Sequence, residues 1–113
     1  MEMEKTAYMS MLYDFYGGLL TAKQKEYLEL YYEQDLSLSE ISEELNVSRQ
    51  AVYDNIKRSE QILAHYESVL RLIEQYAVNE KHLKVLQEYV RTHYQEDAVL
   101  HRLVQEIGNG EDK

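Results

Sequence analysis

Apolar residues recur at helical spacing through the middle of the chain. The intervals alternate between four and three residues, which places the side chains on one side of a helix. This stripe consists of Val52, Ile56, Ser59, Leu63, Tyr66, Leu70, Ile73 and Ala77. Since no glycine, proline or evident cap interrupts residues 49–76, the pattern predicts one helix of about 28 residues, or about 40 Å. A helix of this length needs packing partners along its side.

The residues just before this stripe have the pattern of a helix-turn-helix. Ser37 and Glu40 have the spacing of a capping box, which predicts a short helix starting near Leu38. Asn46 tolerates the left-handed backbone conformation of a tight helix end, so we expect the short helix to stop there. Ser48 is a suitable N-cap for the long helix that follows. A short helix, a tight turn and a second helix make up the motif.

The remaining apolar periodicities predict four more helices. They span residues 4–16, 22–34, 79–94 and 98–107, with ends at Gly17-Gly18 and Gly108, a capping box at Thr21 and a cap at Asn79. The last two are expected to bury Leu83, Leu86, Val90, Val99, Leu100, Leu103, Val104 and Ile107. Proline is absent and glycine occurs only four times, which favours uninterrupted helices.

These elements predict an all-α fold in one domain of residues 1–113. Residues 19–63 form the helix-turn-helix module, and residues 64–107 form C-terminal helices that pack as a bundle. Residues 108–113 are expected to be a disordered tail. The tyrosines of residues 27–32 fit core positions with their hydroxyls at the water boundary, although aromatic rings can also stack on bases.

The exposed side of the second motif helix carries the side chains that can contact a nucleic acid. The candidates are Ser48, Arg49, Gln50, Tyr53, Lys57 and Arg58. Ser48 would meet a phosphate at the helix N-terminus. The next three would face base edges in a major groove, and the last two would hold the phosphate backbone.

Charge limits this interpretation. The chain has a formal net charge of -9, which opposes nucleic-acid binding by the molecule as a whole. Residues 26–44 hold seven acids and no base, whereas residues 45–59 hold Arg49, Lys57 and Arg58 against Asp54. The candidate surface is therefore about two charges positive.

Residues 19–63 also resemble a known module. The segment LLTAKQKEYLELYYEQDLSLSEISEELNVSRQAV is similar to region 4 of bacterial sigma factors. With TAYMSMLYDFYGG before it and VSRQAVYDNIKRSE at its end, the whole chain resembles the YlxM family of small bacterial proteins. That family is described as helix-turn-helix regulators, linked to the signal recognition particle because their genes neighbour those of its GTPase and receptor.

The resemblance leaves two classes of function. The first is a regulator that binds DNA, or the RNA of the signal recognition particle, through its second motif helix. The second is a protein-interaction module that uses the acidic residues 26–44 on a basic protein of that particle. Apolar stripes on a chain of 113 residues also predict a homodimer, formed by the long helix or the C-terminal helices.

Other classes of function find little support in the sequence. The chain has no cysteine for a disulfide or a thiolate metal site. Its four histidines lack zinc-type spacing, no catalytic constellation is visible, and no cofactor is expected. No apolar run approaches the roughly 20 residues of a membrane span, and the acidic N-terminus does not resemble a signal peptide. We therefore expect a cytoplasmic protein that is not an enzyme.

Overall fold

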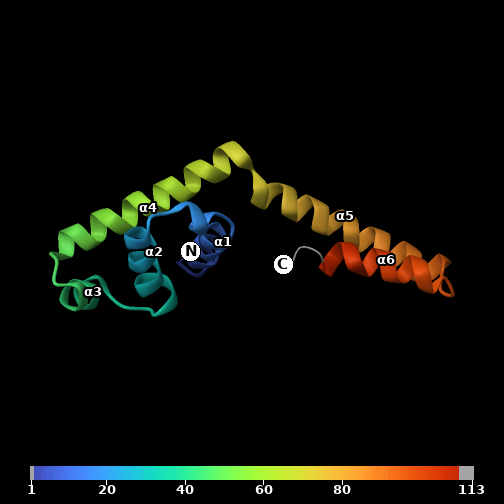
Figure 1. The fold of residues 1–113 in the computed structure, drawn as a ribbon, viewed down its shortest axis with the longest axis horizontal. Coiled ribbons are helices and arrows are strands. Elements are labelled where there is room, and N and C mark those ends of the chain that lie inside the picture. The colour runs from blue at the N-terminus through green and yellow to red at the C-terminus, as the bar shows by residue number, and fades with distance from the viewer. Residues whose placement is uncertain (1, 110–113) are drawn as a thin grey trace. The chain divides into compact units, whose positions relative to one another are not determined.

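Most of residues 2–109, the part of the chain that this computed structural model describes, is helical (Figure 1). The order of its elements is α1 (Glu2–Tyr16), the 3-10 turn η1 (Gly17–Leu19), α2 (Ala22–Leu28), the π-helical turn η2 (Glu29–Glu33), α3 (Leu38–Leu45), α4 (Arg49–Leu70), α5 (Leu72–His93) and α6 (Ala98–Asn109). No strand occurs within these residues, so the all-α prediction is confirmed. The chain divides between Ile73 and Glu74 into two compact units, an N-terminal and a C-terminal one.

Two capping boxes open α2 and α3, as the sequence predicts. The Thr21 hydroxyl accepts from the Gln24 amide at 3.1 Å, and the Gln24 side chain accepts from the Thr21 amide at 3.0 Å. Ser37 and Glu40 exchange the same pair of hydrogen bonds at 3.1 and 2.8 Å. These bonds satisfy amides that have no partner within their own helix.

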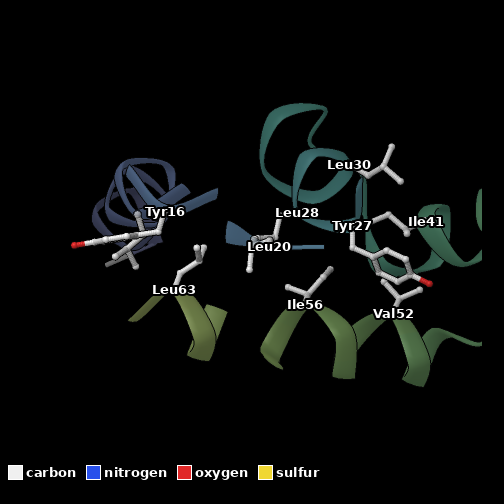
Figure 2. Packing of buried hydrophobic residues seen from close by; sticks show 10 residues of the cluster. Tyr16, Leu20, Tyr27, Leu28, Leu30, Ile41, Val52, Ile56 and Leu63 are labelled. Carbon is white, nitrogen blue, oxygen red and sulfur yellow. The ribbon is translucent and has the colours of Figure 1, made fainter. Parts of the chain in front are cut away.

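The core of the N-terminal unit lies where α4 packs against α1, α2 and α3. Val52, Ile56 and Leu63 project from α4 toward these helices, with Tyr16 above Leu63 and Tyr27 above Val52 (Figure 2). The three α4 side chains are at most 5% exposed, and Ser59 between them is fully buried. The first half of the predicted stripe is therefore confirmed.

The prediction of one helix over residues 49–76 is wrong at its C-terminal end. α4 continues well past Leu63, as expected, but it ends at Leu70. Arg71 has the left-handed angles φ 55° and ψ 33°, and α5 begins at the next residue. Asn79, the predicted cap of a later helix, lies inside α5. Leu70 is 46% exposed and so does not join the core.

Hydrogen bonds from a distant side chain hold this break. The Tyr16 hydroxyl donates to Oε1 of Glu67 at 2.5 Å and accepts from the Leu72 amide at 3.1 Å. The same Oε1 accepts from the Ile73 amide at 3.1 Å. The two oxygens thus cap the first amides of α5. Tyr16 lies 56 positions before Leu72, so local spacing could not reveal this cap.

The C-terminal unit is an antiparallel hairpin of α5 and α6 (Figure 1). The junction predicted at residues 95–97 is confirmed. Asp97 caps α6 by accepting from the Leu100 amide at 2.9 Å. His101 Nε2 of α6 lies 2.8 Å from the carbonyl oxygen of Tyr94, across the turn. The packing of this pair on α4, as in the predicted bundle, stays a prediction.

Burial inside the hairpin is narrower than predicted. Val90 and Val104 are buried, and Leu83 and Leu100 are half-buried. The other four side chains expected to be buried are exposed, namely Leu86, Val99, Leu103 and Ile107. α6 also includes Gly108, where the tail was predicted to begin, and residues 110–113 of that tail lie outside the described residues.

A helix can cross a bilayer only if it is long and apolar enough. Among the described helices, none is long and apolar enough to cross a bilayer.

Candidate nucleic-acid interface

A three-residue turn joins α3 to α4 and fixes the angle between them. Asn46 adopts the predicted left-handed conformation, with φ 55° and ψ 48°, and its amide donates to the Ser42 carbonyl. The Val47 amide donates to that same carbonyl at 3.1 Å, and the Ser42 hydroxyl donates to the Val47 carbonyl at 2.5 Å. Ser42 of α3 therefore holds Asn46 and Val47 of the turn through its backbone carbonyl and its hydroxyl.

The N-terminus of α4 begins directly after this turn. The Ser48 hydroxyl oxygen accepts from the Ala51 amide at 3.0 Å, which confirms Ser48 as the N-cap. The first turn of α4 contains no acidic residue, so the partial positive charge of the helix end is not neutralised there. An anion such as a phosphate is the ligand that suits this position.

The structure brings the six predicted contact residues together along the first three turns of α4. All six are exposed to solvent: Ser48, Arg49, Gln50, Tyr53, Lys57 and Arg58. The opposite side of α4, which carries Val52, Ile56 and Leu63, packs on α1, α2 and α3 (Figure 2). We call these six residues the α4 face.

Asp54 interrupts the α4 face with a negative charge. The Gln50 side-chain amide donates to Oδ1 of Asp54 at 2.9 Å. This hydrogen bond orients Gln50 and places a carboxylate next to the three basic side chains. Since Asp54 is exposed, it would repel a phosphate backbone that approached α4 from this side.

Partly buried tyrosine–glutamate pairs support α4 on its packed side. Tyr32 of η2 donates its hydroxyl hydrogen to the carboxylate of Glu60, a residue that is only 7% exposed. Burial, and then the bond to Glu60, raises the pKa of Tyr32. Likewise, burial and then the bond to Glu67 raise the pKa of Tyr16. These two pairs anchor α4 to η2 and α1.

A third pair joins α1 to the segment that precedes α3. Tyr13 donates to Glu29 at 2.5 Å. Burial, followed by this hydrogen bond, raises the pKa of Tyr13 to about 12.

Sequence reasoning missed the role of Glu60 and Glu67. A signal was nevertheless present, because Glu60, Leu63 and Glu67 follow the three-four spacing of a buried helix side. Carboxylates at such positions require hydrogen-bond donors, and tyrosines are abundant in this chain, with 11 in total.

A metal site finds no support within residues 2–109, where no group of three or more histidine and carboxylate side chains could hold an ion. The arrangement instead offers a helix N-terminus, a small set of donors and a rigid support. These groups suit an anionic polymer such as a nucleic acid.

Comparison with known proteins extends the argument to the whole chain. A family model described as "Putative helix-turn-helix protein, YlxM / p13 like" matches residues 3–107. The chain belongs to this YlxM/p13-like family. The match covers α3, α4 and the hairpin together, so both compact units belong to the pattern of the family.

Several relatives in the YlxM/p13-like family match over nearly their full length. A UPF0122 protein of Limosilactobacillus reuteri is 49% identical over 113 residues, which is 100% of both chains. One from Latilactobacillus sakei is 49% identical over 109 residues, or 96% of each chain. A third, from Geobacillus kaustophilus, is 49% identical over 105 residues, covering 93% of this chain and 96% of its own.

Proposed function

We propose that this protein is a regulator that binds nucleic acid through the α4 face. The observation that carries the proposal is the exposure of the N-terminus of α4, with its six candidate side chains, at the end of a tied turn. Helix-turn-helix proteins place the N-terminal residues of their second helix against base edges in the major groove. Double-stranded DNA is therefore the partner we expect first.

Each residue of the α4 face has a role in this proposal. The amides of the first turn and the Ser48 hydroxyl contact a phosphate. Arg49, Gln50 and Tyr53 face base edges, while Lys57 and Arg58 contact the backbone. Gln50 would have to exchange its hydrogen bond to Asp54 for one to a base.

RNA is the alternative polymer. The YlxM resemblance links the family to the signal recognition particle, whose RNA also offers phosphates and exposed bases. Tyr53, which is 46% exposed, could stack on an unpaired base. Binding of the RNA of the particle in preference to DNA would support this form of the proposal.

A protein partner is the second candidate, and the acidity around α3 favours it. Glu43 and Glu44 are exposed at the C-terminal end of α3, within a segment that holds seven acids and no base. Such a surface suits a basic protein, for example one of the signal recognition particle. Glu40 is less available because its carboxylate caps α3.

One set of variants separates these functions. Arg49→Ala with Lys57→Ala should abolish binding of labelled genomic DNA fragments or of the particle RNA at low salt. Lys81→Ala with Lys84→Ala removes the same charge from α5 and should leave binding unchanged. Asp54→Asn should strengthen binding by removing repulsion. Fluorescence anisotropy measures all three.

Reversing Glu43 and Glu44 to Lys tests the protein partner. It should weaken capture of basic proteins from a nuclease-treated lysate if α3 is the contact surface. Nucleic-acid binding is refuted if neither DNA fragments nor the particle RNA bind at low salt.

A further inference from the structure

The hairpin of α5 and α6 has a very small interior. Among its described apolar side chains, only Val90 and Val104 are less than 9% exposed. Gly108 lies so close to Leu83 that a Cβ at position 108 would be 3.2 Å from it. Two helices of this length bury too little apolar surface to be stable by themselves, since units below about 40 residues usually need another partner.

One side of the hairpin carries apolar residues that are not buried between α5 and α6. Val99, Leu103 and Ile107 follow one another at intervals of four on α6, and Leu86 and Tyr89 lie one turn apart on α5. Leu86 and Ile107 line the same hollow between the two helices, so both sets belong to one surface. These five residues are 41% to 58% exposed, and their neighbour Val85 is 67% exposed. We call the five residues the hairpin face.

Two ion pairs flank the hairpin face. Arg91 pairs with Glu88 at 2.5 Å, and Arg102 pairs with Glu106 at 2.8 Å. The hollow that Leu86 and Ile107 share is also lined by Glu80 and His82. Residues 74–113 hold eight acids and five bases, compared with 13 acids and seven bases in residues 1–73. Electrostatic repulsion between two copies is therefore weaker at the hairpin than at the N-terminal unit.

We propose that the hairpin face binds the same face of a second copy of this chain. Two antiparallel hairpins that meet in this way form a four-helix bundle with an isologous interface. A specific interface buries at least about 1,000 Å² in total, or about 500 Å² per chain. The five half-exposed side chains would therefore form the centre of the contact, and their neighbours on α5 and α6 would form its rim.

A second copy is the partner that this surface fits best. The five apolar side chains at the centre of this surface offer nothing to select a partner of opposite charge. Another hairpin, however, brings an apolar surface of the same area and the same length. The inference rests on residues of the hairpin alone, so it does not depend on the proposed nucleic-acid binding.

Sedimentation equilibrium at micromolar concentration tests the proposal. The wild-type protein should have twice the chain mass of 13.5 kDa, whereas Leu103→Glu with Ile107→Glu should have the mass of one chain. As a matched control, Tyr8→Glu with Leu19→Glu places the same charges at exposed apolar residues of the N-terminal unit. This control should remain dimeric. A wild-type monomer, or a dimer that only the control disrupts, overturns the proposal.

Cross-linking tests the surface without disturbing the fold. Since the chain has no cysteine, Leu103→Cys provides a single site for a short bismaleimide cross-linker, which can then join only two copies. Lys84→Cys, at an exposed position outside the hairpin face, is the control. Efficient cross-linking through position 103 and little through position 84 supports the proposal. Equal yields at both positions contradict it.

Discussion

Glu60 is a carboxylate in a place where carboxylates are rare. It is 7% exposed and accepts the hydroxyl hydrogen of Tyr32 from η2. A buried acceptor of this kind is stable only while it keeps a donor, because the carboxylate loses its hydration on folding. The pair therefore specifies how α4 lies against η2, in a way that apolar contacts alone would leave less defined.

Tyr32→Phe should destabilise the protein by about 1–3 kcal/mol, because it leaves a buried carboxylate without that donor. Tyr8→Phe is the matched control, since Tyr8 is 45% exposed on α1, and it should have almost no effect. Urea denaturation followed by circular dichroism measures both. Equal midpoints for the two variants would show that the Tyr32–Glu60 bond does not stabilise the fold.

Stability should also fall in alkaline solution. The pKa values of Tyr13, Tyr16 and Tyr32 are raised above the ordinary value of 10.0, that of Tyr13 to about 12. A raised pKa in the folded state means that the stabilisation is complete below pH 10 and is lost as the pH rises through the folded values. Melting temperatures between pH 8 and pH 12 should decline more gently for Tyr13→Phe with Tyr32→Phe than for the wild type. Parallel curves would rule out these hydroxyls as the cause.

At the scale of the element, the groups that cap each helix decide where that helix begins and ends. The starts of α2, α3 and α4 were predictable because each cap uses residues within three positions of one another. The break after Leu70 was not, since the Tyr16 hydroxyl that caps α5 comes from α1. Apolar periodicity reports which side of a helix is buried, but it does not detect a cap supplied by another helix.

Tyr16→Phe should loosen the start of α5. The Leu72 amide would lose its acceptor, and Glu67 would lose the donor that orients it toward Ile73. Amide hydrogen exchange measured by NMR should become faster at Leu72 and Ile73, while amides in the interior of α4 should change little. Unchanged exchange at both residues would mean that the Tyr16 hydroxyl does not hold the break.

The turn between α3 and α4 gives a second prediction at this scale. Asn46→Ala should cost about 1–2 kcal/mol, because alanine adopts the left-handed conformation less readily than asparagine. Asn46→Gly should be nearly neutral. Thermal unfolding distinguishes the two. A loss as large for glycine as for alanine would show that the Asn46 side chain, rather than its backbone conformation, is what matters.

At the scale of the whole molecule, the sequence predicted membership of a helix-turn-helix family and the all-α fold. It also predicted the residues that the structure brings together on the α4 face, because their spacing on one helix determines their position. It did not predict the exposure of Leu86 or Leu103, since the periodicity of a helix is the same whether its partner is in the same chain or in another molecule.

At this scale, the small number of basic residues on the α4 face predicts how strongly binding depends on salt. If Arg49, Lys57 and Arg58 make the phosphate contacts, the logarithm of the binding constant should fall with the logarithm of salt concentration at a slope of about −2 to −3 per α4 face, and about twice that for a dimer. Anisotropy titrations between low and moderate salt measure the slope. A much steeper dependence would require basic contacts outside the α4 face.

The π-helical turn η2 links the length of one segment to the burial of Glu60. Its Gln34 amide donates to the carbonyl of Glu29 at 3.0 Å, five residues back instead of four. The segment from Ala22 to Glu33 can thus be regarded as an ordinary helix that has gained one residue. Deleting a residue within η2 would restore regular pairing but turn Tyr32 by about 100° relative to Tyr27. The extra residue in this helix and the buried carboxylate of Glu60 therefore depend on each other. Removing either one alone should destabilise the protein.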